Sequence, residues 1–195
     1  FLSSGLFAQN VEFDKANFKE DKDGLKTAKD NLKVGDDLYS QGPGFYKEAI
    51  PSYEAANKFN PNNAELNYKL GQCYMASMFK FKALPHLEKA LKLNPSIDPQ
   101  IHYLLGQAYH LDMQFDKGVS EYSQFQRTIM NGADQYLIQD VMMRIQQCAN
   151  GKQLVANPIR VFVDNLGDNV NTQYNEYGAV ISADESVMVF TARRP

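Results

Sequence analysis

Tryptophan is absent from this 195-residue chain, although it holds 12 phenylalanines and 11 tyrosines. Two cysteines are too few for a disulfide framework and show no metal-ligand spacing. Basic residues are not in excess, since 20 Lys and Arg against 23 Asp and Glu give a net charge of −3, which argues against nucleic acid as the main partner. No run reaches the roughly 18 apolar residues that a membrane-spanning helix needs. The remaining composition, 44% hydrophobic and 22% charged, is enough to bury a core.

The N-terminal segment 1–8 is apolar and small, and polar sequence begins at Gln9. This change is typical of the end of a secretory signal peptide cut after Ala8, although Leu6 is larger than the residue usual at that place. The alternative is a short apolar arm that packs on the first helix. We expect a signal-peptide remnant at 1–8 and an N-terminal arm at 9–23.

A repeat organises the residues that follow. Segments 68–74 and 103–109 share the frame Tyr-x-Leu-Gly-Gln-x-Tyr, their glycines lie 35 residues apart, and Gly35 precedes Gly71 by 36. Paired alanines seven residues apart and then a proline follow the first two frames, at 49, 56 and 61 and at 83, 90 and 95. A third, degenerate copy carries Gly118, Tyr122 and Phe125 in these places. The spacing resembles the tetratricopeptide pattern.

We therefore predict a mainly α fold, a tetratricopeptide-repeat solenoid of three repeats over 24–150. The small residues mark places where helices approach closely, and Asn and Pro end one repeat and cap the next. The last helix closes the exposed apolar end of the array. The expected helices are 24–39, 45–59, 64–77, 80–93, 99–111, 115–130 and 134–149. A linker is expected at 151–157.

After Asn157 the pattern becomes β-like. Residues 160–163 form a short β-prone run, and the runs 178–182 and 186–191 are joined by Ala183-Asp184-Glu185, which predicts a hairpin. Because an isolated hairpin is marginally stable in water, residues 158–195 are interpreted as the incomplete start of a larger β domain.

Segments 165–167, 171–177, 180–186 and 190–194 resemble the first blade of TolB-like β-propellers, with Ala183 and Glu185 in place of the usual Pro and Gly. With the preceding repeats, the chain resembles Bacteroidota-type envelope proteins that carry tetratricopeptide repeats, a TolB-like propeller and an OmpA-like C-terminal domain. PorE-like members of this group belong to the type IX secretion system. The resemblance implies a periplasmic, outer-membrane-associated protein whose partner is an outer-membrane β-barrel of the PorP/SprF type or its periplasmic segments. Peptidoglycan binding would need the OmpA-like domain, which this sequence does not contain.

The first helix of each repeat offers a candidate groove. We number each repeat so that its Leu-Gly pair holds positions seven and eight. Positions five, nine and twelve then lie on one face of the first helix. Tyr, Gln and Met on such a face suit an extended peptide or a helix. The alternative is that the tyrosines only fill space between repeats. The predicted groove residues are Asp36, Tyr39, Tyr68, Gln72, Met75, Tyr103, Gln107 and His110.

Catalytic signals are weak. His86, His102 and His110 do not share a ligand spacing, so we expect structural histidines, no metal and no cofactor. Cys73 occupies a small-residue position and is expected to be a buried thiol, while a Cys73–Cys148 disulfide is the less favoured alternative. No phosphate loop or nucleophile elbow occurs. Two hypotheses follow: a non-enzymatic adaptor that binds a protein partner, or a structural spacer whose propeller recognises peptide or glycan.

Overall fold

The computed structural model of the chain describes residues 9–130, 132, 135–160, 162 and 164–193, and the segment 1–8 lies outside them. The chain forms two compact units that divide between Asn157 and Pro158. The first unit is helical and the second is a small β-hairpin, so the mainly α prediction is confirmed. Among the described helices, none is long and apolar enough to cross a membrane.

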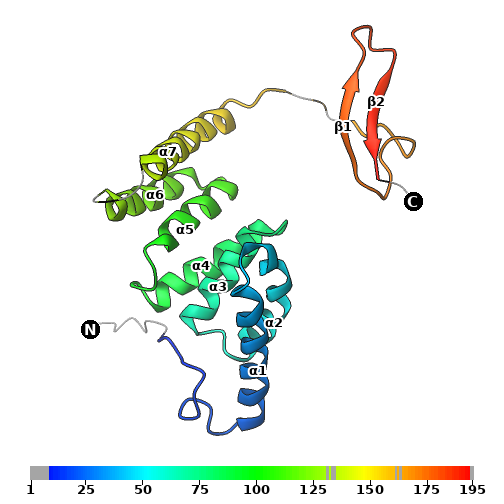
Figure 1. The fold of residues 1–195 in the computed structure, drawn as a ribbon. Coiled ribbons are helices and arrows are strands. Elements are labelled where there is room, and N and C mark those ends of the chain that lie inside the picture. Colours follow the sequence, from blue (N-terminus) through cyan, green and yellow to red (C-terminus); the bar gives the residue numbers. More distant parts are fainter. Residues whose placement is uncertain (1–8, 131, 133–134, 161, 163, 194–195) are drawn as a thin grey trace. The chain divides into compact units, whose positions relative to one another are not determined.

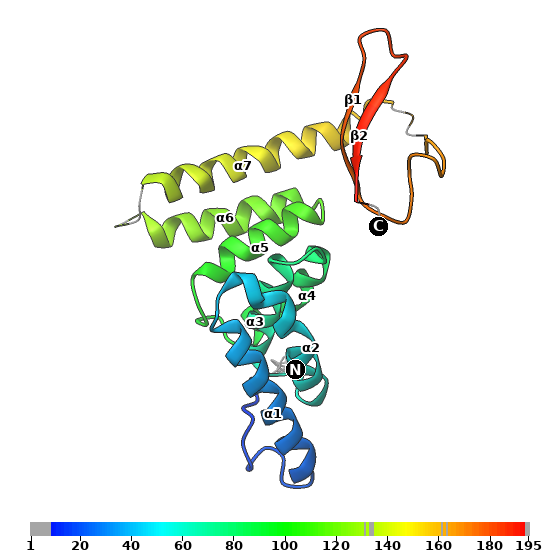
Figure 2. The same cartoon turned by 45° about the vertical axis from the view of Figure 1, so that its right-hand side comes forward.

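The helical unit is an array of antiparallel helix pairs (Figure 1). Its elements are α1 (Lys22–Tyr39), η1 (Pro43–Phe45), α2 (Tyr46–Phe59), α3 (Ala64–Met75), η2 (Lys80–Lys82), α4 (Ala83–Leu93), α5 (Gln100–Leu111), α6 (Phe115–Ile129) and α7 (Gln135–Ala156). Helix α1 packs on α2, α3 on α4 and α5 on α6, and contacts of α2 with α3 and of α4 with α5 join successive pairs. Helix α7 packs along α6 and closes this end of the array, as predicted (Figure 2).

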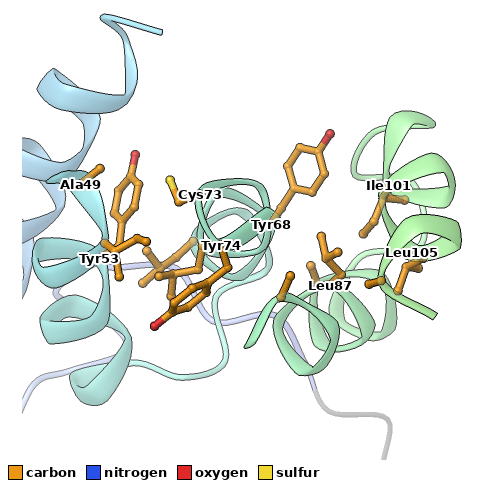
Figure 3. Packing of buried hydrophobic residues seen from close by; sticks show 14 of the residues in the cluster. Ala49, Tyr53, Tyr68, Cys73, Tyr74, Leu87, Ile101 and Leu105 are labelled. Atoms are coloured by element: carbon orange, nitrogen blue, oxygen red, sulfur yellow. The ribbon is translucent and has the colours of Figure 1, made fainter. Parts of the chain in front are cut away.

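Glycines set the distance between paired helices. A Cβ added to Gly71 would lie 2.4 Å from Leu87 Cδ2, and one added to Gly35 would lie 2.5 Å from the Tyr53 ring. Both partners are fully buried in the core that Figure 3 shows. Since real side chains do not approach this closely, only glycine allows these helix pairs to form as they do. The prediction that the small residues mark close helix contacts is confirmed.

The helix ends follow local capping chemistry. The Asn63 side chain accepts a hydrogen bond from Leu66 N at 2.9 Å and so caps α3, as the Asn-Pro turn predicts. Helix α1 begins two residues before the predicted Gly24, because the Asp21 carboxylate accepts from Gly24 N at 2.7 Å and caps it.

The predicted linker at 151–157 is wrong, because α7 continues to Ala156. Gly151 does not end the helix; it lies against Phe115 of α6, where an added Cβ would be 2.6 Å from the ring. One residue later, the Lys152 ammonium pairs with Asp116 of α6 at 2.7 Å. Contacts with α6 therefore hold two further turns of helix.

The N-terminal arm is bound to the turn between α2 and α3. Val11 N donates to Asn62 O at 2.8 Å, and Val11 O accepts from the side-chain amides of Asn60 at 2.8 Å and Asn63 at 3.1 Å. Asn10 Oδ1 accepts from Ala64 N at 2.8 Å. The arm is thus bound mainly through the main chain of Val11, in the way that a protein binds an extended peptide.

Replacing Asn60 with alanine is expected to lower the free energy of unfolding by about 1–2 kcal/mol, because a buried hydrogen bond is lost and Val11 O loses a partner. Urea unfolding followed by circular dichroism measures this. Asn62→Ala is the control, since within the described residues only the main chain of Asn62 forms hydrogen bonds here. Equal losses in both variants would show that the Asn60 contact with the arm contributes nothing.

The second unit is an antiparallel hairpin of β1 (Glu176–Ile181) and β2 (Met188–Ala192). The predicted hairpin is confirmed, with both strands shifted by one or two residues. Residues 160 and 162, from the run expected to be β-prone, are not in a strand, because no neighbouring strand supplies hydrogen bonds there; residues 161 and 163 lie outside the described residues. Apolar side chains that point to both faces are exposed, including Val180, Ile181 and Val189.

Candidate protein-binding face

The eight predicted groove residues lie on α1, α3 and α5, the first helix of each repeat. Tyr68 is buried, and the other seven are partly buried. Much of their surface therefore packs against other residues of the array. The contacts of each residue show whether it can also bind a partner.

Two of them join the first repeat to the second. The Asp36 carboxylate accepts hydrogen bonds from the Tyr53 hydroxyl at 2.7 Å and from Lys69 Nζ at 2.8 Å. The Tyr39 hydroxyl donates to Gln72 Oε1, and the Tyr39 ring stacks on Tyr46. These side chains fix the angle between repeats as well as lining the face.

Tyr103 serves packing. Its hydroxyl donates to Asp140 Oδ2 of α7 at 2.6 Å, and its ring meets Tyr122 edge to face at 5.7 Å. Together with Phe125 and Val141, these rings form a second apolar cluster under the capping helix. For Tyr103, the space-filling alternative is therefore the one that the contacts favour.

Five of the eight predicted residues line two hollows of the array, and Gln72 lines neither. The first, of about 380 Å³, contains Tyr68 and Tyr39 and is called the Tyr68 hollow here. The second, of about 230 Å³, brings Met75, Gln107 and His110 together with the cationic side chains of Lys80 and Arg144. Asp36 lines a smaller neighbouring hollow of about 200 Å³.

Residues 35–77, which begin at Gly35, match the family described as "TPR repeat". This part of the chain has the tetratricopeptide-repeat sequence. The search of curated proteins found no match.

Two solved structures are similar to the chain. The TPR domain of P58(IPK) has a TM-score of 0.49 and 15% identity over 69% of this chain, which spans only 36% of that one. The MamA protein has a TM-score of 0.47 and 20% identity, and the matched part covers 75% of this chain and 85% of that one.

Sequence reasoning missed the charged residues of the tetratricopeptide face. Lys69 holds position six and was not considered, although it pairs with both Asp36 and Glu65 at 2.8 Å. Burial opposes its charge, but the hydrogen bonds from its ammonium to these carboxylates outweigh burial and raise the pKa of Lys69. Asp98 lies in the turn before α5 and Arg144 on the capping helix. The repeat frame could have identified Lys69, because position six is part of it. It could not have identified Asp98 or Arg144, because the turn and the capping helix lie outside the repeated positions.

His86, His102 and both cysteines take structural positions in the array. His102 Nδ1 lies 2.6 Å from Glu121 Oε2, and His86 Nδ1 lies 3.0 Å from Asn67 Oδ1. Cys73 and Cys148 are free thiols, fully buried in different apolar clusters, so the alternative of a disulfide between them is wrong. Burial raises the pKa of the Cys73 thiol to about 12, which keeps it protonated and unreactive.

Proposed function

We propose that this chain is a non-enzymatic adaptor that binds a protein partner along the face formed by α1, α3 and α5. One observation carries the proposal: five of the eight predicted residues line two hollows on that face, and both hollows hold charged side chains beside apolar ones. Such a surface suits a peptide segment, because a few polar groups orient it and apolar walls provide contact area. Tetratricopeptide-repeat proteins are typically scaffolds for other proteins.

The finer proposal rests on the resemblance to Bacteroidota-type envelope proteins. On that resemblance, the adaptor works in the periplasm at the outer membrane, in a PorE-like type IX secretion assembly, and holds a β-barrel of the PorP/SprF type by its periplasmic segments. The hairpin would begin a TolB-like propeller, and an OmpA-like domain would tether the whole to the cell wall.

Binding of synthetic peptides from the periplasmic turns and tail of a PorP/SprF-type barrel to the full chain tests this proposal. Exchanging Gln107 and His110 together for alanine is expected to weaken binding at least tenfold, about 1.4 kcal/mol, because both side chains line the second hollow. The matched control exchanges Lys58 and Lys92, exposed on the second helices of their repeats, and should leave the affinity unchanged. Peptides that bind both variants as tightly as the parent chain would contradict the proposed face.

The spacer hypothesis keeps one observation in its favour. The hairpin exposes 67% of Val180, 59% of Ile181 and 67% of Val189, so strand side chains on both faces have no cover within the described residues. A larger β domain that covers them could carry recognition itself. That hypothesis predicts that barrel peptides fail to bind the chain at all, whichever residues of the array are exchanged.

A further inference from the structure

The Tyr68 hydroxyl is buried without a hydrogen-bond partner among the described residues, and Tyr68 lines a hollow that a ligand could enter. Tyr68 is 7% exposed, and its hydroxyl forms no hydrogen bond within the described residues. Figure 3 shows the ring between α3 and α5 with its hydroxyl directed away from Leu87. The same residue lines the Tyr68 hollow. A buried hydroxyl without a partner is costly, so a group that enters the hollow and hydrogen-bonds to it is favoured.

The carboxylate of Asp98 lines the same hollow as Tyr68. Asp98 comes close enough to raise the pKa of Tyr68, adding to the larger effect of burial, yet no hydrogen bond of normal geometry joins the two. Asp98 Oδ1 accepts from Gln100 N at 2.8 Å, which fixes the carboxylate at the start of α5. Within the described part of the chain, Asp98 forms no ion pair.

The charges that line the Tyr68 hollow are unbalanced. Glu12, Glu65 and Asp98 face a single cation, Lys69. That ammonium is already shared between Glu65 and Asp36, at 2.8 Å from each. Among the described residues, the Glu12 carboxylate accepts only from the neutral side-chain amides of Asn10 at 2.7 Å and Asn63 at 3.2 Å. The hollow therefore has negative charge that the described part of the chain does not neutralise, and a cation is its complement.

We propose that the Tyr68 hollow binds an arginine side chain of the partner segment, with the guanidinium on the Asp98 carboxylate and one of its N–H groups donating to the Tyr68 hydroxyl oxygen. This rests on the proposed function, because it assumes that a protein segment lies on the face. Arginine fits better than lysine, since its planar guanidinium presents several donors at once and can satisfy two acceptors. The volume of about 380 Å³ has room for the whole side chain.

The test uses the capped pentapeptide acetyl-Ala-Ala-Arg-Ala-Ala-amide and the same peptide with citrulline, which keeps the shape of arginine without its charge. Each is titrated into the full chain, with amide shifts followed by NMR. We expect the arginine peptide to shift the amides around Tyr68 and Asp98, and the citrulline peptide to bind at least about fivefold more weakly. Asp98→Asn should weaken arginine binding by a similar factor while keeping the hydrogen bond to Gln100 N, and Tyr68→Phe should weaken it about two- to fivefold.

Asp37→Asn is the control, because it removes an exposed carboxylate of α1 that does not line the hollow. Equal binding of the arginine and citrulline peptides, or arginine binding that survives Asp98→Asn, would overturn the proposal. Barrel peptides that bind through Gln107 and His110 while the arginine peptide leaves the Tyr68 hollow unshifted would refute this inference and leave the adaptor standing. If neither the barrel peptides nor the arginine peptide binds, both the adaptor proposal and this inference are refuted.

Discussion

Exchanging Tyr122 for alanine is expected to lower the free energy of unfolding by about 3–5 kcal/mol. Tyr122 is fully buried, packs over Gly106 and meets the ring of Tyr103 edge to face, in the cluster that also contains Phe125. Alanine would leave a cavity between α5, α6 and α7 that the rigid helices cannot fill. Urea unfolding of the full chain, followed by far-ultraviolet circular dichroism, measures the loss.

Tyr122→Phe is the matched control, because it keeps the ring and removes only the hydroxyl. That hydroxyl is buried and has no hydrogen-bond partner within the described residues, so its removal should leave stability unchanged or raise it. A loss above about 1 kcal/mol in the phenylalanine variant would show that the hydroxyl is engaged and that the cavity accounts for only part of the alanine effect.

Gly106→Ala is expected to lower the free energy of unfolding by about 2–3 kcal/mol, although alanine is the better helix former. The new Cβ would lie 2.7 Å from the Tyr122 ring, which is fully buried, so the ring and its neighbours would have to shift to admit it. The same unfolding experiment tests this. The control is Gly44→Ala, where nothing lies within 4 Å and stability should stay the same or rise by up to about 1 kcal/mol. Similar losses at both glycines would mean that backbone freedom, and not the contact with Tyr122, sets the requirement.

The repeat register could be predicted because its signals are local. Each Leu-Gly pair, each alanine pair and each Asn-Pro turn belongs to a stretch of a few residues, and the helices that these signals predict agree with the structure within a few residues at most boundaries. The predicted helix 134–149 ends seven residues before α7 does, because the contacts that extend α7 are not local in sequence. Gly151 signals a helix end locally, whereas its contact with Phe115 lies 36 residues away in sequence, as does the ion pair from Lys152.

The candidate site was harder to predict, because residues at the same position of different repeats have different neighbours in the structure. Tyr68 and Tyr103 both hold position five, but Tyr103 belongs to the last repeat and reaches Asp140 of the capping helix. Tyr68 lines a hollow with Asp98, from the turn before α5, and no hydrogen bond of normal geometry joins the two. The repeat frame predicts that both tyrosines lie on one face. Which of them can bind a partner depends on the element that follows its repeat, α7 for Tyr103 and the turn before α5 for Tyr68.

The bound arm has a consequence for the order in which the chain acquires its structure during synthesis. Within a repeat, paired groups are close in sequence, such as Tyr53 and Asp36, 17 residues apart. The arm joins partners 49 to 54 residues apart, because Val11 meets Asn60 and Asn10 meets Ala64. Helices α1 and α2 can therefore pair as soon as they leave the ribosome, while Asn10 and Val11, although synthesised earlier, stay undocked until α3 has begun to appear.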